Sequence, residues 1–326
     1  MFHLAMSSSH GNSSGHSICL AWLLAIGILI VASSAGTAAF AQPAPKVVNQ
    51  IEQIKGESFQ KQLKKAKMNA LPNYISIRIY KKDAELEIWA GNNDQENMTL
   101  LAVYPICAMG FDPGTKLKQG DERTPEGSFS LDFYNSSKNW YMHINLSPDH
   151  IDDPGNVHNG PAFYACTDYP TDFDKQLSAS MGINKPGSAI CLHGNCTSVG
   201  CASVQNHDFI EIYYWIAKHD IETYGPPRVH ILPFRFYEPC KTNTDSPEAS
   251  ANSICTTNRH ALLKLLALKA SYSSYELYLL GKEKIAALWK HIGERELMFI
   301  KNPTPANAEL NLSMDILEGS EPSIAP

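Results

Sequence analysis

The stretch Tyr74-Ile-Ser-Ile-Arg-Ile-Tyr80 alternates apolar and polar residues, the period of a β-strand with one face toward a core. Residues 84–89 alternate in the same way, and residues 100–106 form a third apolar run. The segments between these runs, 81–83 and 91–94, have the composition of turns. The three runs therefore predict an antiparallel meander.

Further strands and a helix follow the meander. Residues 128–133 come after a passage rich in Gly and Pro, residues 189–192 have the composition of a buried strand, and residues 228–234 that of a closing strand. Asn206 is a capping residue that opens a segment to Lys218 with apolar residues at helical spacing. We therefore predict a mostly β domain with a helix packed behind its last strands.

The remaining segments are assigned by composition. The stretch up to about Gly187 is polar with few regular signals, so we expect a long loop there. The acidic end of the chain, rich in Pro, Ala and Asn, is expected to be disordered. The predicted segments are a signal peptide (1–41), a lead-in segment (42–72), the β domain (73–238), a linker (239–257), a helical C-terminal extension (258–301) and a disordered tail (302–326).

The amino-terminal segment has the features of an export signal. An uncharged apolar run extends from Ile18 to Ala32, shorter than the roughly 20 residues of a membrane-spanning helix. The triplet Ala39-Phe40-Ala41 fits a cleavage site before Gln42. The usual basic residues are missing, since the first Lys or Arg is Lys46. We therefore expect export to the periplasm, with an uncleaved membrane anchor as the alternative.

The cysteine count predicts a free thiol. The chain has eight cysteines, and cleavage of the leader would remove Cys19 and leave an odd number. In an oxidising compartment an odd number leaves at least one thiol unpaired, which then needs a function. Cys240 and Cys255 bracket a polar loop that they could close as a disulfide, and the pairing of the other cysteines is open.

The charge distribution excludes one class of partner. The formal net charge is −6, and no run of Lys or Arg forms a basic face. Binding to nucleic acid by release of counterions therefore has no basis in this chain.

The most informative segment is His193-Gly-Asn-Cys-Thr-Ser-Val-Gly-Cys201. It places an imidazole and a thiol in one Gly-bearing turn between a strand and a helix. A thiol attacks as the thiolate, and a nearby imidazole can take its proton. Gly200 lets the backbone fold tightly, so that successive N–H groups, including that of Cys201, can hold a developing oxyanion.

Residue chemistry alone leaves two other interpretations of these cysteines open. Cys191, His193, Cys196 and Cys201 could bind a metal ion, although their spacings are irregular for zinc. Alternatively, Cys191 and Cys196 could form a local disulfide, and Cys201 could be a buried inert thiol.

The same block resembles the catalytic signature of the YkuD-type L,D-transpeptidase domain, and is most similar to its YafK-like branch, which reads H-G-x-C-x-S-x-G-C. The resemblance extends from about Tyr74 to Phe236. It implies a mostly β catalytic domain, a sandwich or barrel with flanking helices, that needs no metal or cofactor. Further segments that agree with it are 86–89, 104–107, 120–121, 124–127, 143–145, 169–170, 174–175 and 233–235.

The resemblance also implies a role for each matching residue of the block. Cys201 is the nucleophile, and His193 is the general base and then the general acid. Gly194, Ser198 and Gly200 shape the loop, with the N–H groups of Gly200 and Cys201 forming the oxyanion hole.

Residues around the block carry weaker expectations. His143 and Arg123 are candidate substrate contacts, with a packed histidine and a solvated arginine as the ordinary alternatives. Glu126 is expected in a turn lining the cleft, and His207 at the surface. The family residue after the nucleophile is often aromatic or Arg, whereas this chain has Ala202 at that position.

The implied reaction starts on the stem peptides of peptidoglycan. The thiolate attacks a peptide carbonyl next to meso-diaminopimelate and forms a thioester, and an amine then accepts the acyl group, which makes the enzyme a transpeptidase. If water is the acceptor, the protein is an amidase that releases diaminopimelate-linked peptides or proteins, with an outer-membrane protein as a candidate partner. The alternative of another class is an inactive peptidoglycan-binding scaffold, which the presence of both Cys201 and His193 disfavours.

Overall fold

The computed structural model describes residues 45–93, 97–111, 114–134, 146, 164–236 and 275–318, all within one compact unit. Several predictions lie outside these residues: the signal peptide, the 239–257 linker, the Cys240 and Cys255 pair, and His143. No helix within the described ranges is long and apolar enough to cross a membrane.

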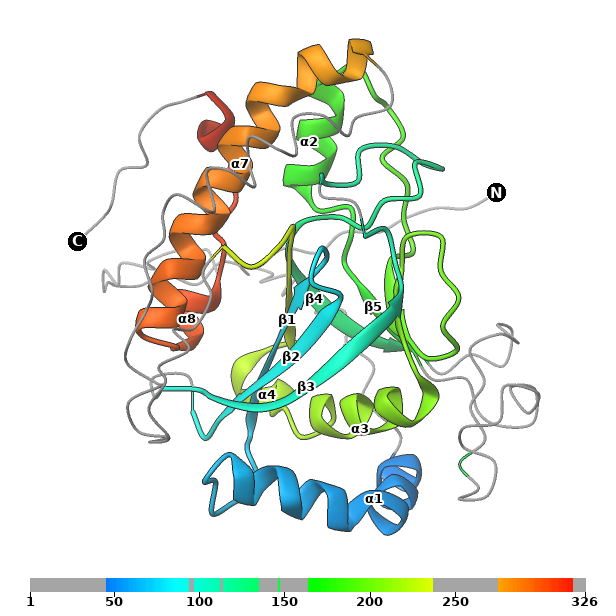
Figure 1. Cartoon of the computed structure of the whole chain (residues 1–326), viewed down its shortest axis with the longest axis vertical. Helices are drawn as coiled ribbons and strands as arrows, with labels where there is room; N and C mark the ends of the chain where they lie inside the picture. The colour runs from blue at the N-terminus through cyan, green and yellow to red at the C-terminus, as the bar shows by residue number, and fades with distance from the viewer. Residues whose placement is uncertain are drawn as a thin grey trace, which may run out of the picture. The chain divides into compact units, whose positions relative to one another are not determined.

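The strands close into a barrel, which confirms the prediction of a mostly β domain with flanking helices (Figure 1). The order around the barrel is β1-β2-β3-β7-β6-β5-β4-β8, and the first three strands form the antiparallel meander. β8 closes the barrel, because it pairs parallel to β1 and antiparallel to β4. The strands are β1 (Tyr74–Tyr80), β2 (Glu85–Gly91), β3 (Thr99–Ala108), β4 (Gly127–Tyr134), β5 (Tyr164–Thr167), β6 (Cys191–His193), β7 (Ala202–Val204) and β8 (Arg228–Leu232).

Strand β1 is buried on both faces. Its apolar residues, such as Ile77, belong to the main core, whereas its polar residues Ser76 and Arg78 face the other way and are also buried. The C-terminal helix α7 (Tyr275–Lys301) covers Arg78, whose guanidinium lies 4.2 Å from the centre of the Phe299 ring. The alternation of apolar and polar residues here does not mark a solvent face.

Helices α1 (Pro45–Lys65) and α3 (Asn206–Ile216) pack against each other and share the core of the barrel. The Phe59 ring stacks on Tyr214 with 3.8 Å between centroids. The predicted capping role of Asn206 is wrong, because Gln205 is the N-cap and makes no side-chain capping bond. A short helix, α4 (Ile221–Tyr224), follows before β8.

The polar stretch expected to be a long loop contains β5 and helix α2 (Asp172–Ser180). Thr171 and Asp174 form a capping box at the start of α2, with the Thr171 hydroxyl accepting from the Asp174 N–H. This capping pair is a local signal from which the helix could have been predicted. β5 is too short for a pattern of its own, and backbone pairing with β4 and β6 holds it in place.

The segment expected to be a disordered tail is ordered as far as Glu318. After α7 it forms the helix α8 (Pro305–Ala308) and a 3₁₀ turn, η4 (Met314–Glu318). Leu310 is fully buried, and the Arg295 guanidinium of α7 donates to the Glu309 carbonyl at 2.8 Å. A few apolar anchors against α7 therefore outweigh the polar composition on which the prediction rested.

Candidate active site

The segment with the imidazole and the thiol joins two neighbouring parallel strands. His193 is the last residue of β6 and lies opposite Ser203 of β7, and Cys201 immediately precedes β7. The sheet therefore fixes both ends of the 194–201 loop: His193 ends one strand, and Cys201 stands directly before the adjacent one.

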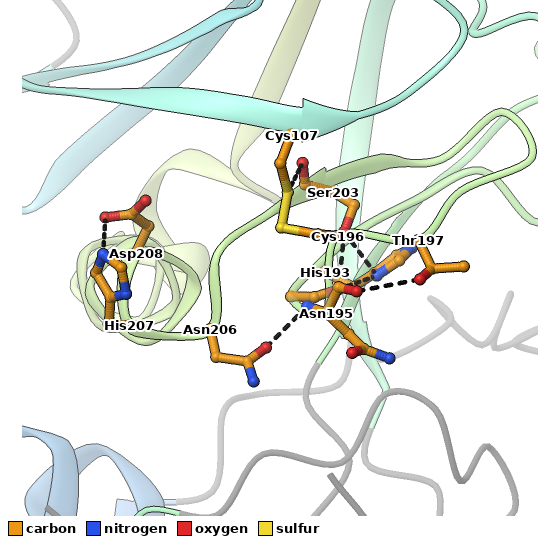
Figure 2. Close-up of a disulfide and its surroundings, with 10 residues drawn as sticks. Cys107, His193, Asn195, Cys196, Thr197, Ser203, Asn206, His207 and Asp208 are labelled. Atoms are coloured by element: carbon orange, nitrogen blue, oxygen red, sulfur yellow. Dashed lines mark hydrogen bonds and ion pairs between the residues drawn. A yellow bond between two sulfur atoms is a disulfide. The ribbon is translucent and has the colours of Figure 1, made fainter. Parts of the chain in front are cut away.

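The loop has unusual backbone angles, held by contacts from outside it. Asn195 and Cys196 have φ values of 75° and 45°, and Gly200 has a φ of 119°. Such values cost free energy in residues other than glycine, so the surrounding structure has to impose them. The Asn206 side chain accepts a hydrogen bond from the Asn195 N–H at 2.8 Å, and a disulfide joins Cys196 to Cys107 of β3, as Figure 2 shows.

The disulfides decide between the interpretations of the cysteines. Cys107 pairs with Cys196, and Cys166 of β5 pairs with Cys191 of β6. A local bond between Cys191 and Cys196 is therefore wrong, and neither residue is available as a thiolate ligand for a metal. Among the described cysteines, Cys201 is the free thiol.

The Cys201 thiol is partly buried and contacts backbone groups. Its Sγ accepts from the Cys191 N–H at 3.4 Å and donates to the Ala189 carbonyl at 3.5 Å. Burial raises the pKa of the thiol, whereas the Cys191 N–H and the positive charge of Lys116 act to lower it. Lys116 is itself buried, with its Nζ 2.6 Å from Asp121 Oδ1.

The His193 ring has a defined tautomer. Its Nδ1 lies 2.6 Å from the Gly194 carbonyl oxygen, and because a carbonyl only accepts, Nδ1 carries the proton and Nε2 has the free lone pair. Burial lowers the pKa of His193, so the neutral imidazole is favoured. Ser203 also donates to the Gly194 carbonyl, at 2.8 Å. Within the described residues, no hydrogen bond joins His193 to Cys201. In free enzymes the contact between a base and a nucleophile is often long, and it shortens when substrate binds.

Ser198 organises the turn before the thiol. Its hydroxyl accepts from the Gly200 N–H at 3.0 Å and donates to the Cys201 carbonyl at 2.6 Å. The Gly200 N–H is thus engaged within the loop, which differs from its expected place in the oxyanion hole. Two N–H groups were expected in the oxyanion hole, those of Gly200 and Cys201. Of these, the Cys201 N–H is not bonded to Ser198.

The neighbouring residues from sequence analysis have the following places. Arg123 is partly buried, with its Nη1 3.4 Å from the Gly114 carbonyl. Glu126 does not line a cleft: it is fully buried and pairs with Lys81 at 3.1 Å. The His207 side chain is 43% exposed and lies 3.3 Å from Asp208.

Sequence analysis missed three residues near the thiol. Lys116 and Thr124 are distant from the loop in the sequence and come close to it in the folded structure. No spacing of residues in the sequence indicates that proximity. The Thr124 hydroxyl donates to the Gly200 carbonyl at 2.8 Å. Val199, two residues before Cys201, is 73% exposed. An apolar residue in a polar loop is the signal that could have identified Val199.

A family model and two curated proteins match this domain. Residues 76–231 match the model of the YkuD family, the L,D-transpeptidase catalytic domain, which confirms the resemblance found in the sequence. Two proteins of Escherichia coli, from strain K12 and from O157:H7, are each described as "Putative L,D-transpeptidase YafK" and are 26% identical over 176 residues. The match covers 53% of this chain and 59% of the length of each of those proteins.

A solved structure also matches part of the chain. It is titled "Structure of Bdellovibrio bacteriovorus Bd1075" and is 20% identical, with coverage of 60% of this chain and 56% of that one. The TM-score is 0.33, too low to support an argument about function or fold.

Proposed function

Because residues 76–231 match the model of the YkuD L,D-transpeptidase catalytic domain, we propose that this protein is a cysteine acyltransferase acting on peptidoglycan stem peptides. The observation that carries the proposal is the free thiol of Cys201 at the position of the family nucleophile, immediately before the strand that pairs with that of His193. No metal or cofactor takes part in the proposed reaction.

The first half of the proposed reaction forms a thioester. The Cys201 sulfur attacks the carbonyl carbon of a peptide bond next to meso-diaminopimelate, and the thiol proton passes to Nε2 of His193. The tetrahedral oxyanion is held by backbone N–H groups, that of Cys201 first among them. The C–N bond then breaks, and His193 returns its proton to the leaving amine.

The second half returns the free enzyme. An acceptor amine attacks the thioester carbonyl, its proton passes to His193, and the C–S bond breaks as the thiol is reprotonated. If water attacks instead, the same steps release a free carboxylate, and the protein is an amidase acting on diaminopimelate-linked peptides or on an outer-membrane protein. We expect Arg123, whose backbone lies against Gly200, and the exposed Val199 to contact the stem peptide.

We propose that the protein works in the periplasm. Two disulfides are expected to persist in an oxidising compartment and not in the cytosol. The apolar run from Ile18 to Ala32, followed by Ala39-Phe40-Ala41, has the features of an export signal and supports the same compartment.

The function is tested by incubating the chain from Gln42 onward with peptidoglycan sacculi, with and without an added amine, and analysing the products by mass spectrometry. New cross-links or amine adducts identify a transpeptidase, and newly released peptides or proteins identify an amidase. The Cys201→Ala variant should lose all activity and keep its circular dichroism spectrum. Full activity in Cys201→Ala, or binding of the wild-type protein without any product, would contradict the proposal.

A further inference from the structure

A chain of buried hydrogen bonds connects the C-terminal helix α7 to the loop that carries the proposed nucleophile. It begins at the Trp289 indole N–H, which donates to Glu126 Oε2 at 2.7 Å. Glu126 Oε1 accepts from Lys81 Nζ at 3.1 Å, and Lys81 Nζ also donates to the Thr124 carbonyl at 2.9 Å. Thr124 in turn donates from its hydroxyl to the Gly200 carbonyl at 2.8 Å.

The side chains that form this series of hydrogen bonds are all buried. Lys81, Thr124 and Glu126 each have 0% exposure, and Trp289 has 3%. A buried ion pair is tolerated when its remaining donors and acceptors are satisfied. The Lys81 ammonium meets this requirement, since it donates to Glu126 and to the carbonyls of Thr124 and Gly114. The indole of Trp289 is the donor to Glu126 Oε2 among the described residues, so α7 completes the coordination of this pair.

The Thr124 hydroxyl acts on the peptide group that contains the proposed oxyanion donor. The Gly200–Cys201 peptide is trans and planar, so its N–H points away from its carbonyl oxygen. Fixing the Gly200 carbonyl therefore fixes the direction of the Cys201 N–H. Thr124 is held in turn, because its hydroxyl accepts from the Gly110 N–H at 2.9 Å.

The contact between these two segments leaves little freedom of movement. A Cβ added at Gly200 would lie 2.9 Å from the Arg123 carbonyl oxygen, and one added at Gly110 would lie 2.5 Å from the Thr124 nitrogen. The 123–124 backbone thus rests directly against both the nucleophile loop and the end of β3. A displacement of Thr124 would be transmitted to Gly200.

We propose that Thr124 is a positioning residue for the oxyanion donor, and that Trp289 of α7 supports it through Glu126 and Lys81. This inference rests on the acyl-transfer function proposed above and adds to it a role for the C-terminal helix. An oxyanion donor acts on the tetrahedral intermediate and not on the thiol before attack. Loss of the positioning should therefore slow acylation of Cys201 and leave its alkylation unchanged.

The test compares two reactions of the same thiol. Acylation is measured as the single-turnover release of p-nitrophenol from p-nitrophenyl acetate, and alkylation is measured with iodoacetamide, whose displacement reaction forms no oxyanion. The Cys201→Ala variant gives the background in both. Thr124→Val replaces the hydroxyl by a methyl group and should slow acylation by about tenfold, less than the 10²–10³ that deletion of a donor costs. Alkylation should stay at the wild-type rate.

The remaining variants separate positioning from general damage. Thr124→Ser keeps the hydroxyl and should restore acylation. Trp289→Phe should slow acylation by a smaller factor than Thr124→Val, again without a change in alkylation. The matched control is Trp89→Phe, which also removes an indole bond to a carboxylate, that of Glu87 at 2.8 Å, but outside this chain of contacts. Trp89→Phe should leave both rates unchanged.

The inference is overturned if Thr124→Val slows acylation and alkylation equally, or slows neither, in protein that keeps its circular dichroism spectrum. If Thr124→Val does not fold, Thr124→Ser and Trp289→Phe decide: equal effects on both reactions in Trp289→Phe overturn the inference. Because the ester reaction needs no peptidoglycan, it gives its answer whether or not the protein acts on sacculi, and the two proposals fail separately.

Discussion

The thiol of Cys201 and the imidazole of His193 are both held in their neutral forms. Burial raises the pKa of Cys201 and lowers that of His193, so a preformed thiolate–imidazolium pair is disfavoured. Proton transfer is therefore expected to accompany the attack on the carbonyl. As the pH falls through the lowered pKa of His193, the ring protonates and can no longer act as the base.

Lys116 is the positive charge that counteracts burial at the thiol. Its charge acts to lower the pKa of Cys201, and its ammonium pairs with Asp121 at 2.6 Å. In a Lys116→Met variant the Asp121 carboxylate would lose its ion-pair partner and keep its bonds from backbone N–H groups, and the thiolate would lose its nearby cation. We expect the pKa of Cys201 to rise and the alkylation rate at pH 7 to fall several-fold. The pH dependence of the iodoacetamide rate measures this.

The control for Lys116→Met is Lys118→Met. Lys118 is exposed and belongs to the same loop, so its replacement removes the same charge without altering the pocket of the thiol. Lys118→Met should alkylate at the wild-type rate across the pH range. An unchanged profile in Lys116→Met would show that the ammonium has no influence on the thiol.

The contrast between these residues shows what sequence can reveal at this scale. Cys201 and His193 were found because their motif is local, with the residues that shape the loop lying between them. Lys116 and Thr124 reach the same loop from distant positions, across contacts that only the closed barrel creates. Their residue types are ordinary for surface loops, so nothing in the pattern distinguishes them.

At the scale of elements, the disulfide from Cys107 to Cys196 ties the end of β3 to the 194–201 loop. Asn195 and Cys196 have positive φ values that this tie helps to hold. In a Cys107→Ala/Cys196→Ala variant we expect kcat to fall and the free energy of unfolding to fall by about 2–4 kcal/mol. Steady-state kinetics with sacculus-derived peptides, together with urea denaturation, measures both.

The second disulfide provides the control for this prediction. Cys166 and Cys191 are direct partners in the pairing of β5 with β6, so backbone hydrogen bonds hold these strands together without it. A Cys166→Ala/Cys191→Ala variant should also lose stability and retain more of its kcat. Equal loss of kcat in the two double variants would argue against a specific role of the loop tether.

The elements themselves were predictable to different degrees. The meander of β1, β2 and β3 follows from alternation and turns, both of which are local. The parallel pairing of β8 with β1 joins segments far apart in the chain, and no local pattern fixes it. The disulfide partners belong to the same class of information, because they depend on which strands become neighbours.

At the scale of the whole molecule, the C-terminal segment forms part of the packing around the barrel. Its apolar residues Ile285, Leu288 and Ile292 share a cluster with Phe234 at the end of β8. Polar contacts add to this, such as the Arg228 guanidinium 3.1 Å from Glu309. The composition of residues 302–318 predicted disorder. Composition does not show that a few apolar residues, such as Leu310, pack against the rest of the fold.

Glu296 of α7 makes the stability of this packing depend on pH. It is fully buried, and burial raises its pKa from an ordinary value of 4.5 to about 7, against the opposing effects of Arg78 and the Phe236 N–H. Below pH 4.5 the carboxyl is protonated in both the folded and the unfolded chain. Between pH 4.5 and 7 only the unfolded chain ionises, so stability is lost as the pH rises, by on the order of 3 kcal/mol for this group.

A Glu296→Gln variant should remove that loss, because the amide is neutral at every pH and its oxygen can still accept from the Phe236 N–H. The free energy of unfolding, measured by urea denaturation at pH 4 and pH 8, should favour the variant over the wild type more strongly at pH 8. Glu294→Gln changes an exposed carboxylate on the same helix and should follow the wild type at both values. A wild-type chain whose stability relative to Glu296→Gln is the same at both pH values would mean that α7 docks with this carboxyl in contact with water.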